Sequence, residues 1–397
     1  MLSNPRGKVK VMCVVLSLVV TLLAATTVLG SGNKLPPIKI GAAGPYTGDV
    51  SKIGLDGLNA IKMAVEEANG AGGIHGRMIE IVEADDGADP SKAILVAEKL
   101  AMDKAVIGVV GPMNSATAQA ALPTYQRAGL AIISQSATYP SLTEMGYKVM
   151  HRICPRDDAQ GPASARFITE TLKAKTVYII DDKTTYGQGL SDQVEPALKA
   201  AGVQVLRGQI AIEDRDFSPI LTRVRASEPD LVYLGLANPA QAASLIKQAA
   251  GLGLKPIFMG GDGLKEKDQL ITGAAGLAEG MYVTSIGKDI QEIPEAQEFI
   301  KKFETRYGAM SVFGGQSYEA ANILIDAARR AASDPMKLNR ANVLAALGET
   351  KDYEGILGFP IGLDAKGDVV GASIFVYQVQ DGEFVQVDEV PAIVLGK

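Results

Sequence analysis

Apolar runs of strand length alternate with amphipathic stretches of helix length along most of the chain. The run Pro37–Ala43 predicts a first strand, and Leu55–Ala68 after it carries its apolar residues on one helical face. A strand at Arg77–Ala84 and a helix at Ser91–Met102 repeat this order. Such alternation is typical of α/β folds with parallel sheets. The series continues with a strand at Val106–Val110, a helix at Ser115–Arg127 and a strand at Leu130–Ser134.

A second series of the same kind begins after Cys154. Its strands, such as Val177–Asp181 and Leu231–Leu236, are uninterrupted apolar runs, which indicates that both faces of the sheet are covered. Two such series predict two lobes of similar build. The remaining predicted elements are strands at Val203–Ile210, Pro256–Met259 and Met281–Ser285, and helices at Leu190–Leu198, Pro219–Ala226, Ala240–Ala250, Pro294–Tyr307, Tyr318–Ala332 and Ala341–Leu347.

The N-terminal segment has the order of a secretory signal. A basic stretch, Arg6–Lys10, precedes an apolar run that starts at Val11, and small residues follow it up to Ser31. We expect residues 1–30 to be removed during export, which makes the mature protein soluble and periplasmic. The alternative is an uncleaved anchor, because the apolar run is long.

Composition and motifs narrow the chemistry. Hydrophobic residues make up 47% and charged residues 21% of the chain, which supports a packed core. A formal net charge of −6 argues against a nucleic-acid partner, and two His and two Cys argue against a disulfide framework or a Cys/His zinc site. Neither the phosphate-binding pattern GxxxxGK[ST] nor a GxSxG nucleophile elbow after a strand occurs. We therefore expect no enzyme, no cofactor and no metal.

The remaining titratable candidates are expected to be structural. His75 lies in a glycine-rich turn and is expected to be solvated, whereas His151 is expected to have a structural role. Asp85 and Asp86 end a strand, where capping a turn is more common than acid–base catalysis. Cys154, the cysteine left after export, is expected to be a small buried apolar residue.

Two consecutive junctions between strand and helix are rich in glycine and hydroxyl groups. Gly111–Thr117 follows the strand that ends at Val110, and Gln135–Thr138 follows the next strand. Free N–H groups at a helix N-terminus bind anions, and ligands of open α/β sheets bind beyond the carboxyl ends of the strands. At either junction alone, simple helix capping by Ser or Thr is an equally good explanation. Together, the two junctions predict a site for a small carboxylate.

At these residues the sequence resembles a known family. The segments GPYTGD, NGAGGIHGR, EADDGADPSKA, GPMNSATAQA, IISQSATYPSLT, DDKTTYGQG and FMGGDG occur from about residue 37 onward. Their order and spacing are similar to those of the periplasmic binding proteins of branched-chain amino-acid ABC transporters. The resemblance covers nearly the whole mature chain.

The resemblance implies a type I periplasmic-binding-protein fold, an α/β fold of two Rossmann-like lobes. Three crossing hinge segments would join the lobes, near Arg152–Asp158, Thr284–Lys288 and Gly362–Gly371. The chain would thus return to lobe 1 for the helices after Pro294, and Ser373–Val379 would belong to lobe 2. The implied limits are residues 36–156 plus 286–366 for lobe 1, which binds the carboxylate, and residues 157–285 plus 367–397 for lobe 2.

The resemblance also implies ligand contacts. Ser115 matches a serine at a helix start that holds the α-carboxylate, and Ser136 and Thr138 match further polar groups around it. Tyr186 matches a tyrosine of lobe 2 that closes over the ligand. Asp262 stands where the family has a glutamate that pairs with the α-ammonium group, and its side chain is one methylene shorter. The side-chain pocket would be lined by Phe313, Met113 and Asn114.

The chain departs from the family at several positions. Ala237 and Ile53 stand where the family has tyrosines, so the cleft is expected to be larger or less polar. Ala88 and Asn114 occupy the two positions of a disulfide that some members have, so both cysteines of that bridge are absent.

The function implied is that of a receptor. It would capture an amino acid, branched-chain or otherwise apolar, between two closing lobes. The receptor, a monomer, would then deliver the ligand to an ABC permease in the inner membrane. The alternatives are a receptor of the same fold for an aromatic or other organic acid or a small amide, and a sensor subunit that presents the same fold to a signalling partner.

Overall fold

The computed structural model describes residues 36–392, so the predicted signal peptide at residues 1–30 lies outside the described residues. Contacts divide the chain into the units Met1–Pro37 and Ile38–Lys397, and the fold below is that of the second unit. No helix in the described range is both long enough and apolar enough to cross a membrane.

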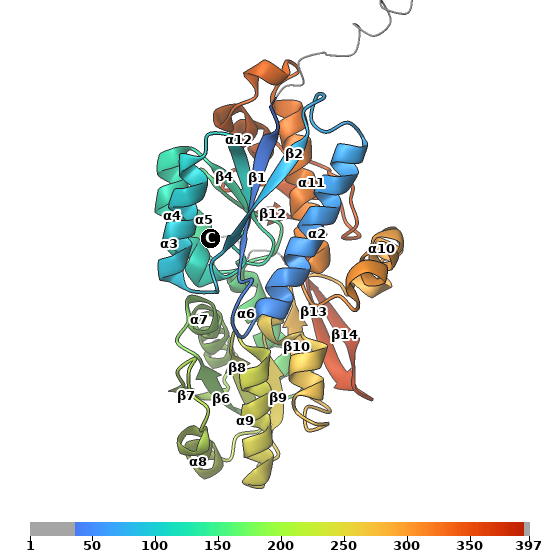
Figure 1. The fold of residues 1–397 in the computed structure, drawn as a ribbon. Coiled ribbons are helices and arrows are strands. Elements are labelled where there is room, and N and C mark those ends of the chain that lie inside the picture. The colour runs from blue at the N-terminus through green and yellow to red at the C-terminus, as the bar shows by residue number, and fades with distance from the viewer. Residues whose placement is uncertain (1–35, 393–397) are drawn as a thin grey trace, which may run out of the picture. The chain divides into compact units, whose positions relative to one another are not determined.

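The first part of this unit forms a five-stranded parallel sheet (Figure 1). Its strand order is β2-β1-β3-β4-β5. β1 lies between β2 and β3, and its register places Ile40 beside Ile81 and Gly108. The carboxyl ends of these strands therefore lie along the same edge of the sheet. The strands are β1 (Ile38–Gly44), β2 (Ile79–Asp85), β3 (Val106–Val110), β4 (Ala131–Ser134) and β5 (Met150–Arg152).

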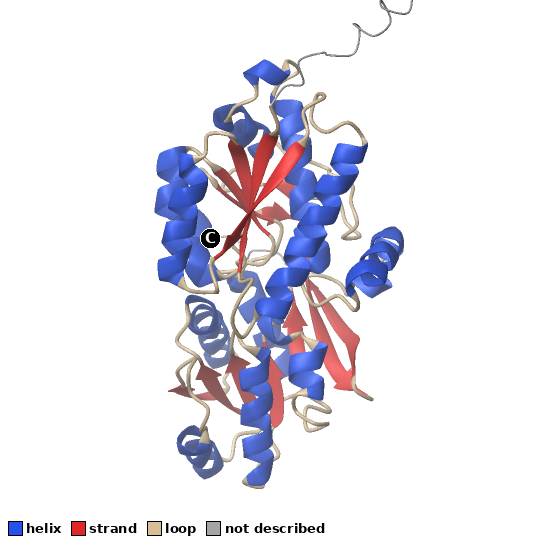
Figure 2. Ribbon diagram, in the orientation of Figure 1, coloured by secondary structure: helices blue, strands red, loops and turns tan. Residues whose placement is uncertain are grey.

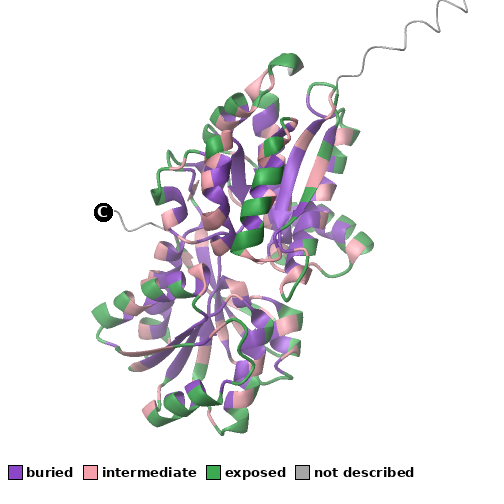
Figure 3. Cartoon of the chain, turned by 60° about the vertical axis from the view of Figure 1, so that its left-hand side comes forward, coloured by how far each residue is buried: buried purple, intermediate pink, exposed green. Residues whose placement is uncertain are grey.

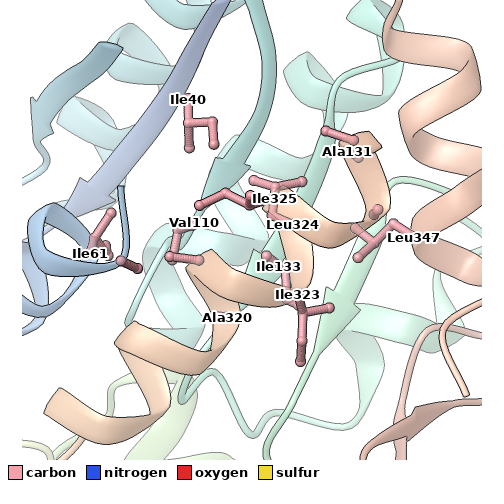
Figure 4. Packing of buried hydrophobic residues seen from close by; sticks show 14 of the residues in the cluster. Ile40, Ile61, Val110, Ala131, Ile133, Ala320, Ile323, Leu324, Ile325 and Leu347 are labelled. Atoms are coloured by element: carbon pink, nitrogen blue, oxygen red, sulfur yellow. The ribbon is translucent and has the colours of Figure 1, made fainter. Parts of the chain in front are cut away.

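Helices cover both faces of the first sheet (Figure 2). One apolar cluster contains Ile61 of α2, Val110 of β3, Leu324 of α11 and Leu347 of α12 (Figure 4). A second cluster, on α3 and α4, includes Val109 of β3. Strand residues thus alternate between the two clusters, as the uninterrupted apolar runs predict. The helices are α2 (Ser51–Gly70), α3 (Pro90–Met102), α4 (Ser115–Ala128), α5 (Ser141–Glu144), α10 (Gln297–Tyr307), α11 (Gly314–Ala331) and α12 (Arg340–Gly348).

The second sheet has seven strands in the order β14-β13-β10-β9-β8-β6-β7. The strands from β6 to β10 are parallel, and β13 and β14 join the edge of the sheet in antiparallel pairing. Figure 3 shows that the inner strands are largely buried and that exposed residues gather on the outer faces of the helices, whereas the edge strands β7 and β14 are exposed or half-buried. The strands are β6 (Thr176–Asp181), β7 (Gln204–Gln209), β8 (Leu231–Gly235), β9 (Ile257–Gly260), β10 (Tyr282–Ser285), β13 (Ser373–Gln380) and β14 (Glu383–Pro391), and the helices are α6 (Asp157–Arg166), α7 (Thr185–Ala200), α8 (Ser218–Ser227) and α9 (Pro239–Gly251).

The chain passes between the two sheets three times. It leaves the first sheet between β5 and α6, returns after β10 to form α10, α11 and α12, and leaves again after the short pair β11 (Gly362–Leu363) and β12 (Val369–Val370). These passages fall where the crossings are predicted. The lobe limits at residues 36–156 plus 286–366 and 157–285 plus 367–397 remain a prediction.

The strands and helices predicted from the two series are present, with displaced ends. Pro294–Tyr307 divides into a 3-10 turn at Pro294–Ala296 and α10. No pattern in the sequence predicts α6 or β14 as an element of its own. α6 contains Gly161 and Pro162, which are poor helix formers, and β14 alternates between exposed and half-buried residues at the sheet edge.

Candidate functional site

A pocket with an empty volume of about 700 Å³, part of it open to solvent, lies beyond the carboxyl ends of strands from both sheets. Its walls come from connections that follow β1 to β4 and β6 to β9, together with the start of α11. This is where open α/β sheets bind ligands. The lining residues are Val50, Ile53, Ala88, Met113, Asn114, Ser115, Ala116, Ser136 and Phe313 from the first-sheet half, and Thr184, Tyr186, Ile212, Ala237, Asp262 and Gly263 from the second-sheet half.

Thr138 is the predicted site residue that does not belong to this lining. It is fully buried, and its carbonyl oxygen accepts a hydrogen bond from Asp157 N (3.0 Å). The structure brings the other predicted residues together around one pocket: Ser115, Ser136, Tyr186, Asp262, Met113, Asn114, Phe313 and Ala237.

The N-terminus of α4 opens toward the pocket. Its first residue, Ser115, lines the pocket, and its capping residue, Asn114, makes no side-chain hydrogen bond to the first turn. Side chains of Asp89, Thr184 and Asn238 cap the starts of α3, α7 and α9, whereas α2, α6, α8, α10 and α11 lack a side-chain cap, as α4 does. An uncapped helix start presents free N–H groups and the positive end of the helix dipole. This end of the pocket therefore suits a carboxylate.

The hydroxyl groups at this end are held by the backbone. Ser115 Oγ accepts from Tyr139 N (3.3 Å), so its own hydrogen is available to an anion. Ser136 Oγ donates to the Met113 carbonyl oxygen (3.0 Å). Both junctions that the sequence singles out thus meet at one point of the pocket.

The turn before α4 requires a glycine. Gly111 has φ +106°, and a Cβ atom there would lie 2.1 Å from the Ala43 carbonyl oxygen. Close packing of this turn against the end of β1 therefore fixes where α4 begins.

Asp262 faces the pocket from the opposite, second-sheet side. It is only 2% exposed, and its Oδ1 accepts from Tyr186 Oη (2.8 Å) and Gln160 Nε2 (2.9 Å). Both partners are neutral, and no Lys, Arg or His of residues 36–392 forms an ion pair with it. Burial raises the pKa of Asp262 to about 6, although the hydrogen bonds from Gln160 and Tyr186 lower it in part. This buried carboxylate suits a cationic group on a ligand.

Close packing aligns Tyr186 with Asp262. Tyr186 Oη accepts from Gly263 N (3.0 Å), which leaves its hydrogen for the Asp262 carboxylate. A Cβ atom on Gly261 would lie 2.4 Å from Tyr186 Oη, so a larger residue there would displace the phenol.

Between these two polar ends the walls are largely apolar. Ile53 and Ala237, at positions where the resembling family has tyrosines, both face the pocket, and Ile212 and Met113 add further aliphatic surface. Phe313 also lines the pocket, and its φ of +71° is unusual for a residue with a side chain. The pocket therefore suits an apolar ligand body with one anionic and one cationic end.

Polar contacts of Asp49, the neighbour of pocket residue Val50, join the two halves of the chain beside the pocket. Asp49, after β1, accepts hydrogen bonds at Oδ2 from Arg215 (3.2 Å) and Asn238 (3.4 Å). Its carbonyl oxygen accepts from Gln269 Nε2 (3.1 Å). A single residue of the first-sheet half thus contacts three residues of the second-sheet half.

The histidines take no part in the pocket. His75 is exposed in its turn, with Nε2 2.9 Å from the Arg329 carbonyl oxygen, as expected of a solvated loop residue. His151 is buried, with Nδ1 3.2 Å from the carbonyl oxygens of Ile132 and Val149, and burial lowers its pKa. The structural role expected for His151 is confirmed.

The remaining candidates are also structural. Asp85 accepts backbone N–H groups from Tyr46 and Gly87, and Asp86 accepts one from Ala88, so both cap turns as expected. Cys154 is fully buried, as expected. No group of three or more potential metal ligands occurs among residues 36–392.

Several residues of the site were not predicted. Ile212 lies in the connection after β7, where no motif marks it, and Thr184 has a visible role as the cap of α7. Gln160, which binds Asp262, lies on α6, a helix that the sequence analysis did not predict. Nothing in the sequence around Gln160, three residues after Asp157, indicates that its amide binds a buried carboxylate.

Comparison with known proteins identifies the family. The model of the periplasmic binding protein family matches residues 37–383. The chain belongs to this family. Its relatives are solute-binding proteins, and the family is that of the substrate-binding components of ABC importers, which implies an extracytoplasmic location.

Two curated relatives from Pseudomonas aeruginosa illustrate the similarity. An amino acid binding protein is 35% identical over 370 residues, which cover 90% of this chain and 95% of the relative. A leucine-, isoleucine-, valine-, threonine- and alanine-binding protein is 34% identical over 345 residues, covering 86% and 89%.

Solved structures show the same fold. A leucine-binding protein from Thermotoga maritima superposes with a TM-score of 0.81 at 26% identity, covering 89% of this chain and 98% of that one. A branched-chain amino acid binding protein from Streptococcus pneumoniae in complex with isoleucine gives 0.79 at 27%, covering 88% and 100%. A solute-binding protein from R. palustris in complex with benzoate gives 0.79 at 22%, covering 90% and 97%, and shares the fold. The fold of this chain is that of the type I periplasmic binding proteins.

Proposed function

We propose that this protein is an extracytoplasmic receptor that binds a free amino acid with an apolar, branched-chain side chain and delivers it to an ABC importer. The observation that carries the proposal is the pairing of two opposite ends in one pocket. The uncapped start of α4, with Ser115, is suited to a carboxylate, and the unpaired Asp262 is suited to an ammonium group. An amino-acid zwitterion carries these two groups on one carbon atom.

The apolar walls favour a hydrocarbon side chain. A polar side chain placed among Ile53, Ile212 and Phe313 would lose hydrogen bonds to water without regaining them. The names of the relatives that bind leucine, isoleucine and valine agree with this choice.

In this account, binding and closure are one process. The ligand carboxylate first meets Ser115 and Ser136 in lobe 1, and Thr138 supports that loop from behind. Lobe 2 then brings Tyr186 and Asp262 to the ammonium group, and contacts present only in the closed form stabilise it. Asp49 would add such contacts.

The closed receptor would act without chemistry on its ligand. We propose that it is a monomer, exported through residues 1–30, which docks on an inner-membrane permease and returns the amino acid unchanged. No cofactor or metal takes part in the proposal.

A receptor for an aromatic or other organic acid is the second candidate. Ala237 and Ile53 favour it, because both leave room and apolar surface where the resembling family has tyrosines. Asp262 opposes it, because a buried carboxylate facing a ligand without a cation would remain unpaired.

A thermal-unfolding screen of the purified protein tests the proposal. Leucine, isoleucine and valine should raise the midpoint by a few degrees or more, because a ligand at a hundred times its Kd stabilises a fold by about 2.7 kcal/mol. Isocaproate, which is leucine without its amino group, and benzoate should give little or no shift. A shift with benzoate and none with the amino acids would refute the proposal in favour of the second candidate.

A further inference from the structure

Behind Asp262, buried side chains lead from the pocket to the first crossing between the sheets. Gln160 Nε2 donates to Asp262 Oδ1 (2.9 Å) and to Asp157 Oδ1 (3.2 Å). Its Oε1 accepts from Asp262 N (3.1 Å) and from Thr284 Oγ1 (2.7 Å), which fixes the orientation of the amide. None of Asp157, Gln160 and Asp262 is more than 2% exposed. Two buried carboxyl groups therefore share one amide.

No protein cation neutralises this pair of carboxyl groups within residues 36–392. Arg152 is the nearby candidate, but its guanidinium binds Asp368 Oδ1 (2.6 Å), Thr143 Oγ1 (2.7 Å) and the carbonyl oxygens of Ala137 and Tyr139 (both 2.9 Å). Besides Gln160, the neutral Thr138 hydroxyl is the side chain that stabilises the charged form of Asp157 by hydrogen bonding, and it brings no positive charge. Two ionised carboxylates this deeply buried repel each other, and a proton on one of them removes the repulsion.

We propose that the Asp157–Gln160–Asp262 cluster holds one proton in the ligand-free protein, an inference that rests on the proposed function. The cluster releases this proton to solvent when an ammonium group binds against Asp262. The ammonium group then supplies the positive charge that the proton supplied before. Only a carboxyl O–H bond breaks, and no bond forms between protein and ligand.

The titration of the cluster is consistent with this exchange. Burial, and then the charge of Asp262, raise the pKa of Asp157 to about 8, while burial raises that of Asp262 to about 6. A hydrogen bond from Thr138 and the charge of Arg152 lower the pKa of Asp157, and Asp158 raises it, each to a smaller extent. At pH 7 the pair therefore holds about one proton. Three other titratable groups lie near the pair: Cys154, Tyr186 and Tyr233. Burial raises the pKa of each, so all three stay neutral at pH 7.

The first test needs no ligand. The infrared spectrum of the purified protein at pH 7 should contain the C=O stretch of a protonated carboxyl group that Asp157→Asn removes. Burial also raises the pKa of Glu319 to about 7, so the readout is the difference between the two spectra. Asp158→Asn is the matched control, because Asp158 is the next residue but pairs with Arg156 (2.6 Å), and its spectrum should keep the band. A difference spectrum without the band overturns the proposal.

The second test counts protons on binding. Calorimetric titration with leucine at pH 7, in phosphate and in Tris, should differ in enthalpy by the equivalent of a proton release of up to one per binding event, because the ammonium group offsets the charge of Asp262. Asp157→Asn should abolish most of this difference, and Asp158→Asn should preserve it. The Kd of the wild type should rise by up to about tenfold for each pH unit from pH 8 to pH 6.

The two proposals fail in different ways. Equal heats in the two buffers, with leucine bound, would overturn the proton exchange and leave the receptor function intact. An absence of heat with every apolar amino acid would count against the receptor function, and the infrared difference would still decide whether the cluster holds a proton.

Discussion

The Asp262→Asn substitution removes a buried, unpaired carboxylate from the pocket and leaves its shape unchanged. The asparagine oxygen still accepts the hydrogen bonds that Tyr186 (2.8 Å) and Gln160 (2.9 Å) donate to Oδ1. The neighbouring side chains therefore keep their partners, and the measured effect belongs to the charge.

The expected loss follows from burial. Asp262 is 2% exposed, so little water screens its attraction to a ligand ammonium group. Removing one partner of a buried, hydrogen-bonded charge pair costs about 2–5 kcal/mol. This corresponds to an increase of about 30-fold to several thousandfold in the Kd for leucine.

Calorimetric titration of the wild type and of Asp262→Asn, each with leucine and with isocaproate, measures this loss. Isocaproate has the carboxylate and side chain of leucine but no ammonium group, so Asp262→Asn should leave its affinity unchanged or improve it. The ligand-free variant should unfold at the same or a higher temperature above pH 6. This is expected because the Asp262 carboxyl has a pKa of about 6 in the folded protein, above that of an unfolded chain, so its ionisation opposes folding as pH rises through that value.

One result would refute this reasoning. If Asp262→Asn bound leucine within a few-fold of wild type and still bound isocaproate poorly, discrimination would arise elsewhere in the pocket. Asp262 would then be a structural acceptor for Tyr186 and not a partner of the ligand.

Three further substitutions test other parts of the account. Asp368→Asn should lower the free energy of unfolding by about 3–5 kcal/mol in urea denaturation, because it leaves buried Arg152 short of its counter-ion, and an unchanged urea midpoint would contradict this. Burial alone would raise the pKa of Asp368, but its arginine neighbours lower it. Wild-type stability should therefore fall only as pH drops through that lowered pKa. Gly261→Ala should weaken leucine binding by about 1–3 kcal/mol in calorimetry with the fold retained, because its methyl group displaces Tyr186; unchanged affinity would show that the Tyr186 position is not critical. Asp49→Ala should weaken binding by only about 0.2–1 kcal/mol, less at high salt, because Asp49 and its ion-pair partner Arg215 are both exposed, and a larger loss would mark it as a principal closing contact.

Local signals predict the α/β series and the Ser115 and Ser136 end of the site, whereas Tyr186, Asp262 and Phe313 follow from the resemblance to the family. Uninterrupted apolar runs mark Val106–Val110 and Leu231–Leu236 as covered strands, and the observed strands, β3 and β8, are buried throughout. Hydroxyl-rich junctions at strand ends mark Ser115 and Ser136, since the carboxyl ends of parallel strands meet at one edge.

The parts that the sequence does not predict depend on contacts between distant segments. Gln160 acquires its role only because α6 lies beside Asp262, 102 residues further along the chain. Thr138 follows the same strand as Ser136, two residues further along, yet it is fully buried and does not line the pocket. Ile212 lines the pocket from a loop whose path no local pattern determines.

The orientation of a bound amino acid decides whether Ser115 and Asp262 hold the two charged ends of the ligand. In a crystal structure of the protein with leucine, the account predicts the carboxylate within hydrogen-bonding distance of Ser115 and the first turn of α4. The ammonium group should lie against Asp262 and the side chain near Ile53 and Phe313. A leucine bound in the reverse orientation, or outside this pocket, would contradict the account.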